Sequence, residues 1–387
     1  MAELTSRQLH TIRRRLAAGT GLGDALGTAG MFTGELAALE AQVREQIGAG
    51  PDISPLLSDP QVTDVVVNGP QELWVDRGAG MEPVEISDPQ LKSAAGVRAL
   101  AVRLAAACGQ RLDDASPIVD GTFGSGVRLH AVIPPLSTGG TLISLRTHRA
   151  QVLSLAQLVA DKSVPAELAE VVRALVARRA NVIISGATGA GKTTFLNTML
   201  SMAAAQERIL IIEEAAELAP RHPHAVHLQV RHANVQGAGE VSMSQLVRAA
   251  MRMRPDRIVL GECRGAEVRD VLGALNTGHE GGWATVHANS AADLPARLTA
   301  LGALADMSEA TVAVQAAAAL DAVIHLQRRG SWRGISEIAR LVRVDGELRA
   351  ISAFRLTASG QVVAGPGAPA LLERLGMTAD TAVGVAQ

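Results

Sequence analysis

The chain of 387 residues contains no tyrosine, and all aromatic residues together make up only 2% of it. Single-stranded nucleic acid is commonly bound by stacking its bases on aromatic side chains, so a surface of that kind is poorly supplied here. The formal net charge of −2 also provides no bulk attraction to nucleic acid or to anionic lipid. We therefore expect no direct binding of nucleic acid.

Cysteine is nearly absent as well, with Cys108 and Cys263 as the only two in the sequence. Two cysteines cannot build a disulfide framework or a four-cysteine zinc module, and this usage fits a reducing cytosol. The sequence has no uninterrupted run of 18 apolar residues, and its first residues lack the apolar segment of a signal peptide. We expect a cytoplasmic protein that reaches a membrane only indirectly, through partner proteins.

The most informative feature that is present is a complete phosphate-loop motif, G-x-x-x-x-G-K-T, at residues 186–193. Its glycines let backbone N–H groups face phosphates, its lysine supplies a mobile charge, and its threonine hydroxyl binds Mg²⁺. An apolar run at 181–185 precedes the motif and a helical run at 192–205 follows it, which is the context that the motif requires. The sequence therefore predicts binding of ATP and Mg²⁺ by Gly186, Ala187, Thr188, Gly189, Ala190, Gly191, Lys192, Thr193 and Thr194.

Carboxylates and histidines follow other predicted strands of the same region. Strand 257–260 runs into Gly261, where such enzymes usually carry an aspartate, and then Glu262, a candidate to orient or deprotonate the attacking water. Strand 208–212 ends in Glu213 and Glu214, which could hold water on Mg²⁺, although ordinary solvated acids are the alternative. His279 and His287 flank strand 283–286 and could contact a γ-phosphate, although each alone is more often structural.

Arginines form a separate group of candidates. Phosphoryl transfer benefits from a guanidinium placed against the γ-phosphate, often supplied by another domain or subunit. Arg128 and Arg146 lie on late strands that precede the nucleotide domain, and Arg231 ends another strand within it. Arginine in a surface salt bridge is the alternative for each of them.

The chain divides into four parts by pattern. Residues 1–50 read as a helical leader, 51–150 as a small α+β domain, 151–357 as the nucleotide domain, and 358–387, rich in Gly, Pro and Ala, as a flexible tail. In the third part strands alternate with helices, which predicts the α/β class with a doubly wound parallel sheet. Asp345-Gly346 between two alternating apolar runs predicts a hairpin near its end.

Taken together, these segments resemble the secretion ATPase superfamily, and most closely its CpaF/TadA branch, which powers assembly of tight-adherence (Flp-type) pili. The resembling stretches are residues 63–70, 126–136, 186–193, 213–218, 252–262 and 277–289. The four-cysteine module of type II secretion relatives is missing, which disfavours that branch.

The resemblance implies a RecA-like ATPase core, a sensor-like N-terminal domain, a homo-hexameric ring and nucleotide bound between the two domains. It matches Glu262 to the Walker B glutamate, Glu213, Glu214 and Glu217 to an acidic Asp box, and His279 and His287 to a His box. Arg128 and Arg146 match N-terminal arginines that reach the phosphates, and Arg231 matches a core arginine. The Asp box usually reads Glu-Asp where this chain has Glu213-Glu214, so the second position is a departure.

The function implied is an ATP-hydrolysing motor that powers pilus assembly or protein export through inner-membrane platform proteins. Two alternatives stay open: a type IV secretion traffic ATPase that moves DNA or protein, and a nucleotide-clamped structural ring with little turnover. The intact Lys192, Thr193 and Glu262 argue against the clamp.

Overall fold

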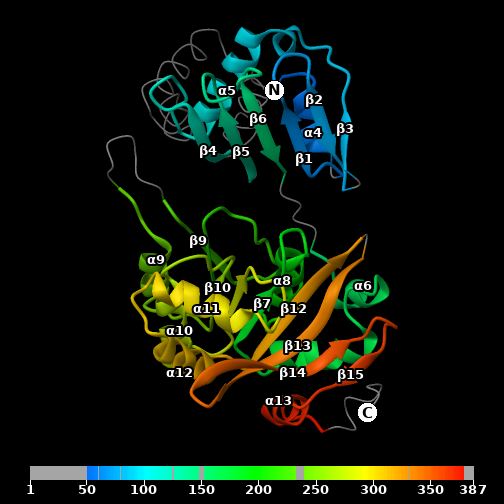
Figure 1. Ribbon diagram of the computed structural model, residues 1–387, viewed down its shortest axis with the longest axis vertical. Coiled ribbons are helices and arrows are strands. Elements are labelled where there is room, and N and C mark those ends of the chain that lie inside the picture. The colour runs from blue at the N-terminus through cyan, green and yellow to red at the C-terminus, as the bar shows by residue number, and fades with distance from the viewer. Residues whose placement is uncertain are drawn as a thin grey trace. The chain divides into compact units, whose positions relative to one another are not determined.

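The computed structural model describes residues 50–59, 61–78, 80–123, 126–147, 152–231, 239–330 and 332–378. The chain forms two compact units that divide between Arg149 and Ala150 (Figure 1). The predicted leader over residues 1–50 lies outside the described residues except for Gly50. Within the described parts, no helix has the length and apolar character needed to cross a membrane.

The smaller unit is built on an antiparallel sheet with the strand order β3-β2-β1-β6-β5-β4. Its described elements are α4 (Ile53–Ser58), β1 (Asp64–Val67), β2 (Leu73–Asp76), β3 (Met81–Pro83), the 3-10 helix η1 (Pro89–Lys92), α5 (Ala94–Ala107), β4 (Ile118–Phe123), β5 (Val127–Val132) and β6 (Leu142–Arg146). Helix α5 begins where the Ser93 hydroxyl accepts a hydrogen bond from Gly96 N–H. It packs on the sheet face that carries the buried residues Val65, Leu129 and Leu145.

The larger unit contains a nine-stranded sheet with the order β15-β14-β13-β12-β7-β11-β10-β8-β9. Its strands are β7 (Val182–Ser185), β8 (Ile209–Glu213), β9 (Ala225–Gln229), β10 (Arg257–Leu260), β11 (Trp283–Val286), β12 (Ala322–Arg329), β13 (Trp332–Val344), β14 (Glu347–Leu356) and β15 (Val362–Ala364). The six strands from β12 to β9 in this order run parallel, whereas β13, β14 and β15 pair antiparallel. The expected wholly parallel sheet is therefore corrected to a mixed one, because the hairpin at Asp345-Gly346 extends the same sheet beyond β12.

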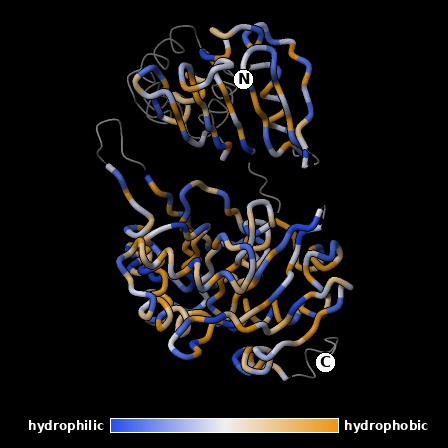
Figure 2. Tube along the Cα trace, viewed as in Figure 1, coloured by the Kyte–Doolittle hydropathy of each residue, from blue (hydrophilic) through white to orange (hydrophobic). Residues whose placement is uncertain are grey.

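Helices cover both faces of this sheet, as expected for a doubly wound fold. They are α6 (Leu155–Ala160), the 3-10 helix η2 (Ala166–Leu168), α7 (Ala169–Ala177), α8 (Lys192–Ser201), α9 (Met243–Ala250), α10 (Val268–Asn276), α11 (Leu294–Ala303), α12 (Glu309–Ala319) and α13 (Ala368–Leu375). On one face α6, α7, α8 and α13 share a hydrophobic core with Ile184, and on the other α9 to α12 share a core with Ile183. Figure 2 shows hydrophobic residues following the strands of both sheets.

The predicted loose tail is wrong for most of residues 358–378. Val362 lies in β15, which pairs with β14, and Leu371 and Leu375 of α13 are buried against the core that contains α7. The Pro and Gly residues that suggested disorder instead mark the two ends of α13. Pro369 lies in its first turn, and Gly376 adopts the left-handed conformation that ends it. Residues 379–387 lie outside the described part of the chain.

Candidate active site

The phosphate loop joins the buried strand β7 to α8 at the carboxyl edge of the parallel strands. Gly186, Gly189 and Gly191 all have positive φ angles, of 153°, 72° and 93°. A Cβ on Gly186 would lie 2.4 Å from the carbonyl oxygen of Leu326 on β12, so no other residue fits there without displacing that strand. The loop therefore has the curled, glycine-dependent backbone that binding of phosphates requires.

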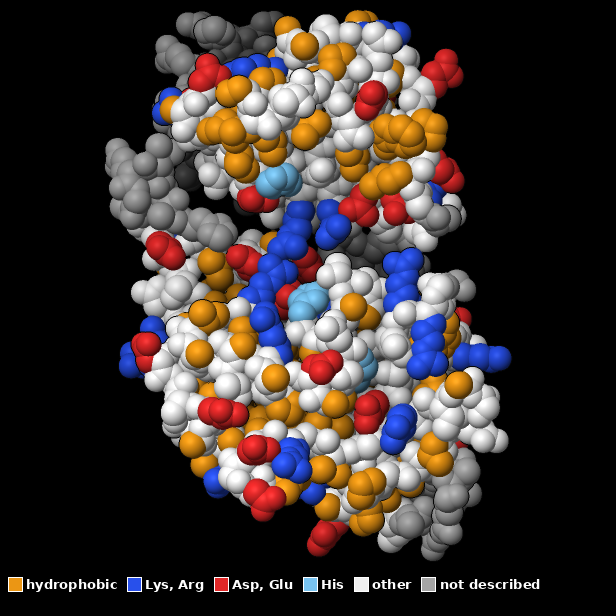
Figure 3. Space-filling model, in the orientation of Figure 1, with side chains coloured by type: hydrophobic (Ala, Val, Ile, Leu, Met, Phe, Trp, Pro, Cys, Tyr) orange, Lys and Arg blue, Asp and Glu red, His pale blue; other side chains and the backbone are white. Residues whose placement is uncertain are grey.

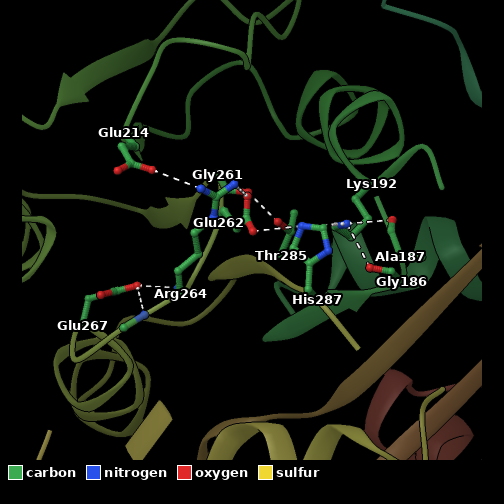
Figure 4. A network of polar contacts seen from close by, with 11 residues as sticks. Gly186, Ala187, Lys192, Glu214, Gly261, Glu262, Arg264, Glu267, Thr285 and His287 are labelled. Atoms are coloured by element: carbon green, nitrogen blue, oxygen red, sulfur yellow. Dashed lines mark hydrogen bonds and ion pairs between the residues drawn. The ribbon is translucent and has the colours of Figure 1, made fainter. Parts of the chain in front are cut away.

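Lys192 lies at the centre of the site, and its side chain is mostly buried. Its ammonium group donates hydrogen bonds to the carbonyl oxygens of Gly186 (2.9 Å) and Ala187 (3.0 Å), and it lies 3.4 Å from Nε2 of His287 (Figure 4). Burial lowers the pKa of Lys192, while the neighbouring Glu262 raises it. The ammonium group of Lys192 thus has only neutral acceptors around it, two carbonyl oxygens and an imidazole nitrogen. A charged phosphate oxygen would bind it more strongly.

Glu262 follows β10 at the same edge. One of its oxygens, Oε2, accepts a hydrogen bond from Arg264 (2.5 Å), and the other, Oε1, lies 3.0 Å from Nε2 of His287. That short separation is not a well-aligned hydrogen bond, since Oε1 is buried and has no donor among the described residues. A buried carboxylate oxygen without a donor suits a residue that accepts a proton or a hydrogen bond from a bound water.

His287, which directly follows β11, lies between the lysine and the glutamate. The pKa of His287 is lowered, first by burial and then by the charge of Lys192, although Glu262 opposes the shift. The imidazole is consequently neutral at pH 7 and can either donate or accept at Nε2. The prediction that Lys192, Glu262 and His287 lie at one sheet edge is confirmed.

Glu213, the last residue of β8, is buried and structurally engaged. Its Oε1 accepts hydrogen bonds from the backbone N–H groups of Glu217 (3.0 Å) and Leu218 (2.9 Å). Its side chain also fills the space beside Gly261, where a Cβ would lie 2.8 Å from Cγ of Glu213. Gly261 therefore stands where such enzymes usually carry an aspartate because the Glu213 side chain, from the neighbouring strand, fills the space that a side chain at position 261 would need. The other oxygen, Oε2, lies 3.8 Å from Nδ1 of His227 and is the one that could still bind the predicted metal-bound water.

Glu214, the other predicted metal residue, is instead linked to Glu262, which follows β10. Arg264 bridges the two, with Nη1 3.3 Å from a carboxylate oxygen of Glu214 and Nη2 on Glu262. The hydrogen bond to Glu262 raises the pKa of Arg264. Below this bridge, Glu267 accepts hydrogen bonds from the backbone N–H groups of Arg264 (2.6 Å) and Gly265 (2.8 Å) and fixes the turn. Arg264 was missed by the sequence reasoning, although its place two residues after Glu262 was a signal.

The expectation that His279 joins His287 at this edge is wrong. His279 precedes β11 and therefore lies at the amino edge of the parallel strands, with Nδ1 3.2 Å from the carbonyl oxygen of Ala274 at the end of α10. Four residues of strand, about 13 Å at 3.3 Å per residue, separate the two histidines. Within one chain, His279 is a loop residue distant from the phosphate loop.

The predicted arginines lie in two different settings. Arg231 forms an isolated bridge with Val241 and its Nε donates to the carbonyl oxygen of Gly239. Arg128 on β5 and Arg146 on β6 are directly opposite each other across the smaller unit's sheet, on the face away from its core, and Arg146 pairs with Asp64 (3.0 Å). Their predicted contact with phosphates stays a prediction.

The residues present fit ATP and Mg²⁺. Thr193 lies in the first turn of α8, the position from which this motif's hydroxyl would bind Mg²⁺ beside a phosphate held by the loop. Among the described residues no group of three or more His, Cys, Asp and Glu side chains could hold a metal ion alone. A cation would thus depend on the nucleotide's own oxygens, which is usual for Mg²⁺.

Comparison with known proteins decides the family. The family model described as "Type II/IV secretion system protein" matches residues 47–337. The chain belongs to this family. A putative conjugal transfer protein of Mycobacterium tuberculosis is 48% identical over 326 residues, which cover 82% of this chain and 92% of the relative.

Two further likenesses agree with the assignment. The type IV secretion system protein PtlH of Bordetella pertussis is 31% identical over 270 residues, which cover 64% of this chain and 78% of PtlH. The crystal structure of the pilus retraction motor PilT with bound ADP superimposes with a TM-score of 0.52 at 20% identity and covers 84% of this chain and 85% of PilT, a likeness of fold alone. The resemblance to the secretion ATPase superfamily and the α/β class are thereby confirmed.

Proposed function

We propose that this member of the type II/IV secretion family hydrolyses ATP and works as a homo-hexameric motor of a secretion or pilus-assembly machine. The observation that carries the proposal is the convergence of Lys192 and Glu262 on one imidazole, at 3.4 and 3.0 Å from Nε2 of His287. This convergence supports a site in which the cation for the phosphates and the acceptor for the water share a single edge of the sheet.

Each residue has a separate task in this reaction. The loop N–H groups and Lys192 bind the β- and γ-phosphates, and Thr193 would hold Mg²⁺, which would neutralise charge on the phosphate oxygens when bound. Oε1 of Glu262 accepts a hydrogen bond from the attacking water and orients it, and Arg264 holds the other oxygen in place. His287 fixes the distance between the two groups.

The test is the substitution Glu262→Gln. We expect hydrolysis to fall by about 10²- to 10⁴-fold, the usual contribution of a general base, with ATP affinity retained because the proposal assigns Glu262 to the water and not to the phosphates. Glu309→Gln, an exposed acid at the start of α12, is the matched control and keeps full turnover. Unchanged turnover in Glu262→Gln would remove this residue from the mechanism.

The process that ATP hydrolysis would drive is proposed from the similar proteins. Pilus assembly or protein export through inner-membrane platform proteins is one candidate, and it fits a chain that reaches the membrane indirectly. Traffic of DNA or protein is the other, and the conjugal transfer and type IV secretion names of the similar proteins favour it. Pilin and platform genes beside this one would support the first, whereas genes for a relaxase and a coupling protein would support the second.

A further inference from the structure

A pocket of about 490 Å³ opens beside the phosphate loop. It is lined by Ala187, His287, Ala288, Asn289, Asp293 and Arg297. Ala187 is the loop residue whose carbonyl oxygen holds the ammonium of Lys192, and His287 is the residue that contacts both Lys192 and Glu262. The pocket therefore lies at the end of the loop where the terminal phosphate would be attacked.

Arg297, in the first turn of α11, contributes a cation without a partner to this pocket. Its Nε is buried and has no hydrogen bond, and its guanidinium forms no hydrogen bond or ion pair with any residue in the described part of the chain. A buried N–H donor without an acceptor costs free energy, which a hydrogen bond to a bound anion would recover. Positive charges at this edge otherwise have partners: Lys192 binds carbonyl oxygens and Arg264 binds carboxylates.

The acid on the pocket's wall does not neutralise this arginine. Oδ2 of Asp293 accepts a hydrogen bond from the Ser290 hydroxyl (2.7 Å), so its side chain is used to close the turn before α11. Burial and Lys192 are the main causes that lower the pKa of His287, and the charge of Arg297 adds to them. The guanidinium thus acts electrostatically on the imidazole at the centre of the site.

We propose that Arg297 is a phosphate-binding residue that contacts the terminal phosphate of ATP from within the same chain. The inference rests on the proposed function, because it assigns a residue to that nucleotide site. A planar guanidinium can bind two phosphate oxygens at once, which Lys192 as a point charge cannot do. ADP lacks the group that Arg297 binds, so the residue distinguishes ATP from ADP.

The experiment compares binding of a non-hydrolysable ATP analogue and of ADP, both with Mg²⁺, to the full chain by calorimetry. Arg297→Gln should weaken binding of the analogue by roughly 10- to 150-fold, the range for hydrogen bonds to charged groups, and leave ADP binding within about twofold. Arg297→Lys should recover part of the loss because it retains the charge. Arg173→Gln, which removes an exposed ion pair on α7, is the control and changes neither affinity.

Two results would overturn the inference. Equal losses for the analogue and ADP would make Arg297 a residue that only supports the fold of the pocket. Unchanged affinity for both would show that it does not contact the nucleotide. Retained ADP binding in Arg297→Gln demonstrates that the variant is folded. Absence of hydrolysis by the natural sequence would refute the proposed function separately, since the ratio of analogue to ADP affinity is measured without turnover.

Discussion

The contact between Glu213 and Gly261 can be tested by a double-mutant cycle. In Gly261→Ala the new Cβ would lie 2.8 Å from Cγ and 3.0 Å from Oε1 of Glu213, an overlap that the buried carboxylate cannot avoid without losing its backbone partners. Overpacking of this kind costs about 1–3 kcal/mol. At about 2–4 °C per kcal/mol for a unit of this size, the melting temperature should fall by roughly 2–12 °C.

The second arm of the cycle removes the glutamate. Glu213→Ala loses two hydrogen bonds to a carboxylate and should cost about 3 kcal/mol by itself. In that background Gly261→Ala should cost almost nothing, because its Cβ enters the space that the glutamate leaves. Scanning calorimetry of the full chain measures the melting of all four proteins. Equal destabilisation by Gly261→Ala in both backgrounds would refute the packing argument.

The same residue allows a functional measurement. Glu213→Gln keeps an oxygen that can accept both backbone N–H groups, so its stability and its ATP turnover should stay close to those of the natural sequence. An increase in the Mg²⁺ concentration needed for half-maximal turnover, with unchanged melting, would instead assign Oε2 to a metal-bound water, as the sequence predicts.

Three further predictions concern the site and the C-terminal helix. Because the pKa of His287 lies below its ordinary value of 6.5, ATP turnover should decline only below pH 6.5, where the protonated ring repels Lys192 and binds Glu262. A profile of kcat/KM against pH measures this decline, and the variant His287→Asn should not show it. Arg264→Gln should lower turnover by about tenfold with ATP affinity unchanged, which is the effect of losing one hydrogen bond to a charged group. Turnover equal to that of the natural sequence would show that Arg264 does not position Glu262. Leu371→Ala, at a fully buried position, should destabilise the larger unit by about 2–5 kcal/mol in urea unfolding, and no change would contradict the packing of α13.

Local signals in the sequence predicted the elements that depend on local physics. Strands 257–260 and 283–286 were predicted to the residue, because short apolar runs bounded by Pro, Gly and Asp define them. The hairpin at Asp345-Gly346 was also predicted, and both residues adopt the positive φ that its turn requires, 53° and 88°. These features need no knowledge of what packs on them.

Elements that depend on distant partners were not predictable in the same way. Strand β12 reads as the continuation of an apolar helical run, and only its pairing with β7, some 140 residues earlier, makes it a strand. Strand β4 contains Asp120-Gly121, which interrupts an apolar pattern, yet it pairs along its whole length with β5. Helix α13 is short and follows a glycine-rich segment, so its order comes from burial against α7 and not from its own propensity.

The site shows the same division. The phosphate loop and Glu262 are visible because each has a motif or a strand end that fixes its place. Arg264 and Arg297 have no motif of their own, and their importance follows from what surrounds them. Arg264 lies between two carboxylates, and Arg297 lines a pocket beside the phosphate loop with its Nε buried and without a hydrogen bond. Other arginines show why residue type alone is uninformative. Arg329 and Arg333 are exposed on the β12–β13 hairpin of the larger unit, where Figure 3 shows basic side chains, and Arg329 binds Gln327 and lies over the Trp332 ring of the same hairpin.

The geometry around His287 also explains how binding and hydrolysis are coupled within the larger unit. A neutral imidazole can donate or accept at Nε2 but cannot do both, so this atom cannot satisfy Lys192 and Glu262 together. In the structure the ammonium competes for it, and Oε1 of Glu262 is left without a donor. A phosphate that draws the ammonium away releases Nε2, which can then donate to Glu262 in the other tautomer. We therefore expect Glu262 to be aligned for the attacking water only when phosphates are bound in the loop.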